Sequence, residues 1–226
     1  MLKNLLNVLF PEFCYGCNQL LIHNNTPLCI KCLYDLSVFS NIKTTPIIPQ
    51  NTDLKIANYW NLFPFEKNGI VQQIIHHLKY NNKPELGRFI VDYLAESLRN
   101  ELNTKEIDLI VPVPLYKKKQ KQRGYNQLDL FGKKLANLIE AQYNNNLLTK
   151  KKSSKSQTRK NSNERNQLNE RNLYQLSKHQ KLNNTHILLI DDVLTTGNTI
   201  RQCLNALRRI PNVKLSVLTI AHTQKS

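Results

Sequence analysis

The sequence predicts an α/β protein in which helices flank a parallel sheet and a small cysteine-rich module precedes them. Two observations support this fold class. Strongly apolar segments with the length of a buried strand alternate with segments whose apolar residues recur at helical spacing. Four cysteines lie together within residues 11–36. Because parallel strands are joined by long crossovers, usually helices, this alternation is typical of a parallel sheet covered on both faces.

The predicted strands are rich in apolar, β-branched or aromatic residues. Residues 55–63 (KIANYWNLF) alternate in character, as expected for a strand. Residues 107–113 (IDLIVPV) and 186–192 (HILLIDD) are almost continuous apolar runs, which is typical of strands buried on both faces. Two further strands are expected at residues 172–176 and 213–221.

Apolar residues three or four positions apart predict helices between these strands. The first two are expected at residues 69–80 (GIVQQIIHHLKY) and 84–102, the second with Pro84 at its start. The other two are expected at residues 126–142 (NQLDLFGKKLANLIEAQ) and 199–210.

Shifts in composition divide the chain into three parts. Residues 1–36 hold a short N-terminal helix and the four cysteines, and residues 37–55 are polar with two prolines, as in a linker. Residues 56–226 form the α/β domain. Within this domain, residues 149–172 are rich in Lys, Ser, Asn and Arg and predict a long mobile basic loop.

The charge of the chain indicates a polyanionic ligand. The 226 residues carry a formal net charge of +16, and an apolar fraction of 40% argues against a disordered chain. Residues 117–171 contain fifteen Lys or Arg and only four Asp or Glu. Such a field attracts nucleic acid, phosphorylated ligands or an anionic membrane face. A solvated, lysine-rich surface is the alternative interpretation.

No targeting segment is predicted. Residues 2–10 (LKNLLNVLF) are apolar but are interrupted by Asn4 and Asn7 and ended by Pro11. A bilayer span needs about 20 apolar residues. We expect this segment to be a short helix packed on the protein, although the basic charge also suits transient membrane contact. The expected compartment is the cytoplasm, with a peripheral position at the inner face of the inner membrane as an option.

The most informative segment follows the predicted strand 186–192, which ends in Asp191 and Asp192. A hydroxyl-rich loop then enters a helix, and its candidate phosphate-binding residues are Thr195, Thr196, Gly197, Asn198 and Thr199. Glycine lets the backbone approach a ligand closely, and free N–H groups at a helix N-terminus favour an anion. The segment predicts a phosphate site at the carboxyl end of a parallel strand, where ligands of open sheets bind.

The two carboxylates would repel that phosphate, so they need hydroxyl donors or a cation. A phosphorylated ribose with magnesium supplies both. The segment resembles the motif with which type I phosphoribosyltransferases bind 5-phosphoribosyl-1-pyrophosphate (PRPP), which implies their fold and this ligand. A strand end with a capping Asp and a Thr turn is the alternative interpretation. The Lys of a Walker loop and the dinucleotide-binding G-x-G-x-x-G pattern are both missing.

A basic loop, residues 115–125, is predicted after the strand 107–113 and is the candidate for binding the pyrophosphate arm of PRPP. Pro112 and Val113 end the strand, and Arg123 has the best shape for two phosphate oxygens. A solvated turn is the alternative. We expect Mg²⁺ to arrive with PRPP and to have few protein ligands. Cleavage at the anomeric carbon needs mainly positioning and charge stabilisation, and no residue stands out as a catalytic base.

The cysteine-rich module predicts a structural zinc ribbon. Two C-x-x-C pairs supply the candidate ligands Cys14, Cys17, Cys29 and Cys32. Four thiolates can surround one zinc ion tetrahedrally and leave no position open for catalysis. Disulfides are the alternative, although nothing indicates an oxidising compartment. Cys203, within the predicted helix 199–210, is expected to be a packed core thiol.

Several motifs in the same order resemble those of the ComF competence proteins. They are the four-cysteine ribbon and the segments 78–80 (LKY), 111–114 (VPVP), 123–127 (RGYNQ), 157–159 (QTR) and 191–197 (DDVLTTG). RGYNQ beside a PRPP motif is the specific marker. The long loop is richer in Asn and Lys than the Arg-rich loop of the family, which leaves open which of its arginines have a role.

The resemblance implies a bacterial cytoplasmic factor for natural transformation that binds PRPP with magnesium and single-stranded DNA and assists the uptake of incoming DNA. Competence helicase or recombination proteins are the implied partners. Cations interleaved with aromatic residues suit single strands. The candidate DNA-binding residues are Lys117, Lys118, Lys119, Lys121, Lys151, Lys152 and Arg159.

Two other functions are compatible with the same residues. The first is an active phosphoribosyltransferase that uses PRPP to modify a nucleobase, a nucleotide or DNA. The second is a zinc-dependent transcription regulator that senses PRPP, which is the weaker hypothesis because the sequence has no helix-turn-helix signal.

Overall fold

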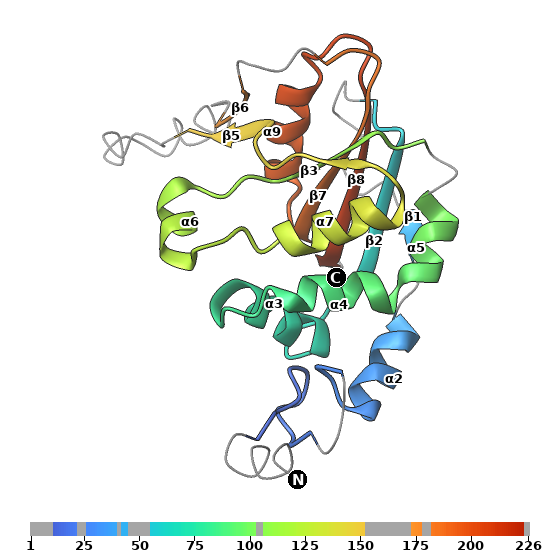
Figure 1. Ribbon diagram of the computed structural model, residues 1–226, viewed down its shortest axis with the longest axis vertical. Coiled ribbons are helices and arrows are strands. Elements are labelled where there is room, and N and C mark those ends of the chain that lie inside the picture. Colours follow the sequence, from blue (N-terminus) through green and yellow to red (C-terminus); the bar gives the residue numbers. More distant parts are fainter. Residues whose placement is uncertain are drawn as a thin grey trace.

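The computed structural model describes residues 11–21, 26–39, 42–44, 55–102, 106–151, 173–177 and 182–223. Its centre is a six-stranded sheet with the strand order β1-β2-β8-β7-β3-β4 (Figure 1). These strands are β1 (Lys43–Thr44), β2 (Asn58–Phe65), β3 (Leu109–Pro112), β4 (Gln142–Tyr143), β7 (His186–Leu194) and β8 (Lys214–Thr223).

The predicted parallel sheet is confirmed. Strands β2, β8, β7, β3 and β4 all pair in parallel, and β1 alone among these six pairs antiparallel, with β2. The two central strands β7 and β8 are buried over almost their whole length. This burial explains their nearly continuous apolar sequences, because both faces of a parallel sheet are covered by other elements.

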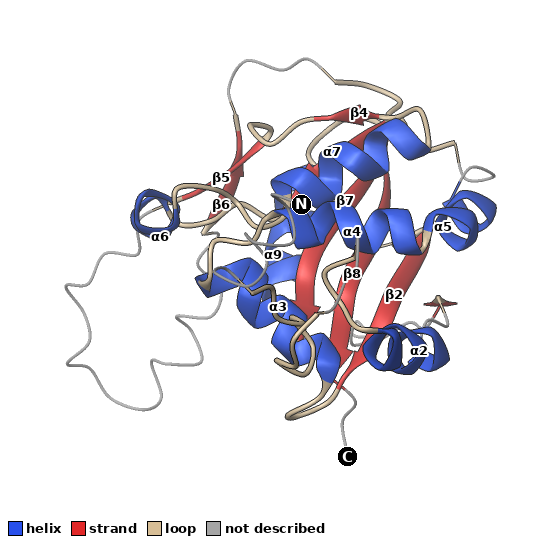
Figure 2. Cartoon of the chain, turned by 60° about the horizontal axis from the view of Figure 1, so that its bottom comes forward, coloured by secondary structure: helices blue, strands red, loops and turns tan. Residues whose placement is uncertain are grey.

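Helices cover both faces of the sheet. One face packs against α3 (Ile70–Tyr80), α4 (Glu85–Tyr93) and α7 (Asp129–Leu138), which Figure 2 shows lying across the central strands. The other face packs against α9 (Asn198–Leu207) and the hairpin of β5 (Leu148–Lys150) and β6 (Tyr174–Leu176). Alternate residues of β7 follow this division, since Leu188 and Ile190 join the first core and Ile187 and Leu189 join the second.

Two predicted helices differ in extent. The helix predicted at 84–102 is two helices, α4 and α5 (Ala95–Leu102), because the chain leaves helical geometry at Leu94, where φ is −102° and ψ is 13°. No Pro or Gly marks this break. The helix predicted at 126–142 is the shorter α7. Glu140 takes a left-handed φ of 57° two residues after α7 ends, and the chain then enters β4.

Three predicted irregular segments contain regular structure. The basic segment after β3, predicted as a loop, forms the helix α6 (Lys117–Arg123), which ends at Gly124 with φ of 82°. The start of the predicted loop 149–172 belongs to β5, and the predicted linker 37–55 holds β1 and the end of α2 (Ile30–Phe39). The predicted helix 2–10 and the part of the basic loop from residue 152 to residue 172 lie outside the described residues.

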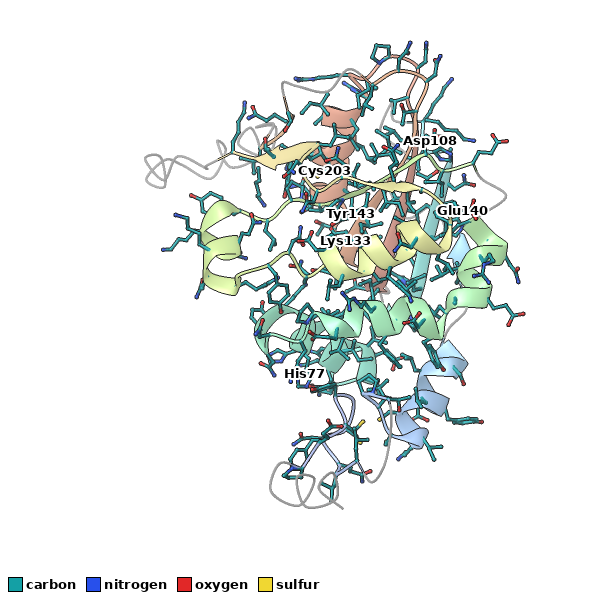
Figure 3. All side chains as sticks on the ribbon, in the orientation of Figure 1. His77, Asp108, Lys133, Glu140, Tyr143 and Cys203 are labelled. Atoms are coloured by element: carbon teal, nitrogen blue, oxygen red, sulfur yellow. The ribbon has the colours of Figure 1, made fainter. Side chains whose placement is uncertain are left out.

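The cysteine-rich module packs against the helices α3 and α4. The ring of Tyr15 lies 4.8 Å from that of His77 on α3, whose position is labelled in Figure 3. The hydroxyl of Tyr93 on α4 donates a hydrogen bond of 2.8 Å to the carbonyl of Leu33 on α2. In the part of the chain that the structure describes, no helix has the length and apolar character that a bilayer span requires.

Gly132 lets α7 approach the sheet closely, and its replacement tests this packing. A Cβ at Gly132 would lie 2.9 Å from Cδ1 of Ile190 and would also overlap the ring of Tyr143. The hydroxyl of Tyr143 donates to Asp129 at 2.7 Å, which restrains the ring. We expect Gly132→Ala to lower the free energy of unfolding by about 1–3 kcal/mol, measured by chemical denaturation. The neighbouring exposed variant Lys133→Ala is the control and should change it by less than about 0.5 kcal/mol; equal values for both variants would contradict the proposed packing.

Candidate functional site

The carboxyl end of β7 carries the two predicted acidic residues. Asp191 and Asp192 lie inside the strand and are 9% and 6% exposed, so both carboxyl groups are largely removed from water. Successive side chains of a strand point to opposite faces. Asp192 contacts residues on the α3 and α7 side of the sheet, whereas Asp191 lies near residues of the α9 side. The neighbouring carboxyl groups therefore have different environments.

Asp192 has two close partners. The amine of Lys79, in the last turn of α3, lies 2.7 Å from Oδ1 of Asp192, and the side-chain amide of Gln127 donates to Oδ2 at 2.5 Å. The guanidinium of Arg123 donates in turn to the side chain of Gln127. Neither Lys79 nor Gln127 is among the predicted site residues. Both belong to segments that carry the ComF resemblance, which was the available signal.

The surroundings of Asp191 disfavour its charged form. Burial raises its pKa well above the usual range, and the adjacent charge of Asp192 raises it further. The backbone N–H of Asp192 donates to its Oδ1 at 2.8 Å, and the charges of Lys79 and Lys150 partly oppose the rise in pKa. A cation or a set of hydroxyl donors at this edge would favour the ionised form.

A polar network supports the strands beside Asp191. Thr219 of β8 is its register partner. The hydroxyl of Tyr59 donates to Asn61 at 2.9 Å and lies 3.3 Å from the hydroxyl of Thr219, and all three side chains are buried. Buried polar groups need such partners. The network therefore places buried polar groups on the strands beside Asp191.

The predicted phosphate loop lies between β7 and α9. Gly197 immediately precedes the helix with φ of 73°, a left-handed conformation that favours glycine. Thr195 and Thr196 are exposed, while Asn198 and Thr199, the first residues of α9, are half-buried. The exposed hydroxyl residues and the N-terminus of α9 thus follow directly after the two acids in the chain, an arrangement suited to a phosphate.

The predicted pyrophosphate residues fall into two groups. Pro112 and Val113 adjoin the end of β7, since Pro112 pairs with Ile190 and the N–H of Val113 donates to the carbonyl of Ile190 at 2.9 Å. Their side chains are buried, so only their backbone can contact a ligand. Arg123 lies at the end of α6 and reaches the hydrogen bonds around Asp192.

The described candidate DNA-binding residues lie on α6 and just after β5, which Figures 1 and 2 place next to each other. Lys118, Lys119 and Lys121 are exposed on α6, and Lys151 is exposed just after β5. Lys117 begins α6, but its side chain lies outside the described part of the chain, as do Lys152 and Arg159. The described lysines thus gather beside the sheet edge that carries the acids.

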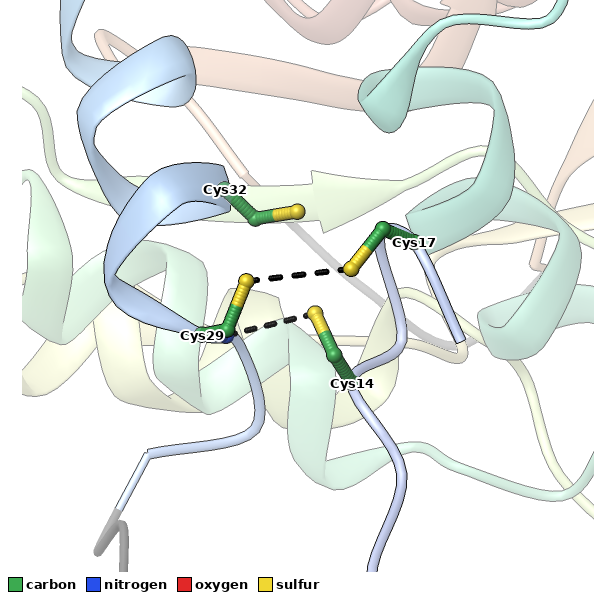
Figure 4. A group of neighbouring side chains, drawn as sticks. All are labelled: Cys14, Cys17, Cys29 and Cys32. Carbon is green, nitrogen blue, oxygen red and sulfur yellow. Dashed lines mark hydrogen bonds between the residues drawn. The ribbon is translucent and has the colours of Figure 1, made fainter. Parts of the chain in front are cut away.

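The four predicted metal-binding cysteines form one cluster (Figure 4). Their sulfur atoms all lie within 4.8 Å of one another, and those of Cys17 and Cys29 are 3.7 Å apart. A tetrahedral zinc site with Zn–S bonds of about 2.3 Å places its sulfur atoms about 3.8 Å apart. All four are free thiols, not disulfides. The donor set and its spacing therefore fit a metal such as zinc.

Backbone amides prepare one of these thiols for a metal. The N–H groups of Cys29 and Gly16 donate to the sulfur of Cys14 at 3.2 and 3.4 Å. Burial alone raises the pKa of the Cys14 thiol, but hydrogen bonds from the backbone outweigh it and lower the pKa to about 7. The thiolate is the form that binds a metal. Cys203 is separate, being fully buried in α9 as predicted.

Comparison with known proteins gives relatives of two kinds. Competence protein F of Haemophilus influenzae is 29% identical over 152 residues, and DNA utilization protein YhgH of Escherichia coli is 26% identical over 154 residues. Each match covers 66% of this chain and 66% of the relative, just under two thirds of each protein. These relatives agree with the resemblance to the ComF proteins that the motifs predicted.

Solved structures with a similar chain path include adenine phosphoribosyltransferases. The enzyme from Saccharomyces cerevisiae gives a TM-score of 0.41 at 16% identity, with 86% of this chain and 89% of that chain covered. The enzyme from Thermoanaerobacter pseudethanolicus gives 0.40 at 14% identity, with 84% and 99% covered.

The family model described as PRTase-CE matches residues 56–226. The matched segment contains the parallel strands, α6, the acidic end of β7 and the phosphate loop, whereas the cysteine cluster precedes it. From residue 56 onward the chain belongs to the PRTase-CE family.

Proposed function

We propose that this protein is a ComF-like factor for natural transformation, which binds PRPP with Mg²⁺ and single-stranded DNA and assists the uptake of incoming DNA into the cytoplasm. The observation that supports the proposal is the carboxyl end of β7, where two buried carboxyl groups precede Gly197 and the N-terminus of α9. The names of the two relatives, a competence protein and a DNA utilization protein, favour the same biological process.

Different residues at the carboxyl end of β7 would bind different parts of PRPP. The backbone N–H groups and hydroxyls of residues 195–199 would hold the 5′-phosphate, since a helix N-terminus favours an anion. Asp191 and Asp192 would accept hydrogen bonds from the ribose hydroxyls or face the magnesium ion. The backbone at Val113 and the side chain of Arg123 would contact the pyrophosphate.

The electrostatics of the unliganded edge also favour a ligand that carries a cation. Two adjacent carboxyl groups with little exposure destabilise each other's charged form, and the raised pKa of Asp191 expresses this. Lys79 forms its ion pair with Asp192, and its charge together with that of Lys150 only partly offsets the raised pKa of Asp191. Magnesium bound to PRPP would supply the missing positive charge while keeping most of its own ligands from phosphate and water.

The second ligand is single-stranded DNA. The exposed lysines of α6 and Lys151 after β5 give a basic surface beside the proposed PRPP site. Lysines that follow a phosphate backbone bind single strands without sequence preference. Competence helicase or recombination proteins are the proposed partners, with peripheral contact at the inner face of the inner membrane. The metal of the cysteine cluster is proposed to be a structural zinc ion, since the cluster is closed.

An active phosphoribosyltransferase is the alternative. Membership of the PRTase-CE family and the acidic end of β7 favour it. In this account PRPP is consumed: the bond between the anomeric carbon and pyrophosphate breaks while an acceptor on a nucleobase, nucleotide or DNA forms the new bond. A catalytic base is not identified among the described residues.

PRPP binding tests the central proposal. We expect the double variant Asp191→Asn, Asp192→Asn to bind PRPP with Mg²⁺ at least 10-fold more weakly than the wild type in calorimetry, because hydrogen bonds to charged groups contribute about 1.5–3 kcal/mol each. Asp92→Asn, an exposed carboxylate paired with Lys134, is the control and should bind as the wild type does.

The same samples separate the two accounts. A factor that only binds PRPP releases no pyrophosphate when nucleobases, nucleotides or DNA are added, whereas a transferase releases it and loses that activity in the double variant. Wild-type protein that is folded by circular dichroism and still gives no heat with PRPP and Mg²⁺ would refute both accounts.

DNA binding by α6 predicts a defined salt dependence. For single strands, the logarithm of the affinity falls with the logarithm of salt concentration with a slope of about −0.7 per phosphate contacted. Changing Lys118, Lys119 and Lys121 to Gln should make this slope shallower by about 2. The matched control changes three exposed lysines elsewhere, Lys31, Lys133 and Lys214, to Gln. An equal loss of slope in both triple variants would show that overall charge, and not α6, drives binding.

Metal analysis tests the cysteine cluster. We expect about one zinc ion per chain by atomic absorption, and its loss in Cys17→Ser because three thiolates no longer complete the tetrahedral site. Cys203→Ala, which changes a core thiol far from the cluster in sequence, should retain the zinc. A wild-type protein without metal, or one that shows fewer titratable thiols than its cysteines supply after denaturation with a chelator, would contradict a zinc site.

A further inference from the structure

A basic cleft lies between the end of α3 and helix α6. Its volume is about 490 Å³, and it is lined by three cations, Lys79, Lys119 and Arg123, and by Tyr80 and Tyr125. None of its described lining residues is acidic. The cleft thus combines positive charge with aromatic rings, which is the composition that suits a nucleotide.

The two tyrosines have different roles in this cleft. Tyr125 is fixed in the wall, because its hydroxyl donates to the carbonyl of Leu78 at 2.7 Å. Tyr80 is 69% exposed, so most of its side chain is available to a ligand. The guanidinium carbon of Arg123 lies 5.6 Å from the centre of the Tyr80 ring. An exposed ring beside a guanidinium is a surface on which a base can stack.

The cleft is connected to the acidic end of β7 by direct contacts. Lys79 lines the cleft and also lies 2.7 Å from Asp192. Arg123 lines it too and donates to Gln127, which donates to Asp192. The ligand of this cleft would therefore lie next to the carboxylate to which the proposed function assigns the ribose of PRPP.

We propose that this cleft is the nucleotide-binding subsite of the protein, in which a base stacks on Tyr80 and the attached phosphate contacts Lys119 and Arg123. The inference rests on the proposed function, because it places the nucleotide beside bound PRPP. A nucleotide can come from a single strand of DNA or from the free pool, and both sources share the base and phosphate that the cleft recognises. The segments 78–80 and 123–127, which carry the ComF resemblance, supply most of this cleft.

The test measures how much binding depends on stacking. Fluorescence anisotropy is recorded with a labelled single-stranded deoxythymidine oligomer and with an abasic strand of the same length. We expect Tyr80→Ala to weaken binding of the oligomer by about 5- to 100-fold, the range for removing one base–aromatic stack, and to leave binding of the abasic strand unchanged. Tyr80→Phe keeps the ring and should bind both strands as the wild type does.

Tyr34→Ala is the matched control, because Tyr34 is 68% exposed on α2 and does not line the cleft. Competition with thymidine monophosphate identifies the source of the nucleotide. Displacement of the oligomer by thymidine monophosphate, weakened in Tyr80→Ala, assigns the subsite to free nucleotides. Absence of displacement, with the loss on the oligomer retained, assigns it to a strand. Both outcomes support the subsite.

Two outcomes separate the nucleotide subsite from the PRPP site. If Tyr80→Ala and Tyr34→Ala bind the oligomer equally well while the wild type binds PRPP in calorimetry, the cleft is not a nucleotide subsite and the PRPP site stands. If PRPP does not bind to the wild type and Tyr80→Ala still weakens only the base-containing strand, the cleft binds nucleotides independently and the PRPP proposal is wrong.

Discussion

The arrangement of this protein depends on one constraint: the central strand β7 is buried on both faces and yet ends in two carboxyl groups. Apolar residues fill the strand from Ile187 to Ile190, so the two cores form on either side of it. Asp191 and Asp192 then continue the same alternation into the two layers. Because a buried carboxylate is destabilising without partners, each layer must supply polar groups at the same edge of the sheet.

The two layers meet this requirement differently. On the side of α3 and α7, the amine of Lys79 and the side-chain amide of Gln127 contact Asp192, so this carboxylate is paired in the unliganded protein. On the α9 side, Asp191 accepts a hydrogen bond from the backbone N–H of Asp192, its neighbour in β7, and the pKa of its carboxyl group stays raised. One acid is thus paired within the fold itself, whereas added positive charge or hydroxyl donors would further favour the charged form of the other. This asymmetry is a physical reason to expect a ligand here.

The sequence predicted what depends on neighbouring residues and missed what depends on distant ones. Continuous apolar runs identified β7 and β8, and the residues from Asp191 to Thr199 predict a phosphate loop because their spacing is local. The helix α6 was predicted as a loop because its sequence, KKKQKQR, has no apolar residues from which a helical period can be read. The pairing of Lys79 with Asp192 joins residues far apart in the chain, and no local pattern indicates it. Likewise, the opposite environments of the two acids became visible only with both layers in place.

The last four residues of helix α3 contact four different parts of the protein. Successive residues of a helix point in directions about 100° apart, so four in a row reach all sides. His77 contacts Tyr15 of the cysteine-rich module, Leu78 is buried in the core, Lys79 reaches Asp192, and Tyr80 projects into the basic cleft. The module, the acidic edge and the cleft therefore share one rigid element. A metal in the cysteine cluster would hold together the module on which α3 rests, and it would thereby contribute to the geometry of the proposed ligand sites.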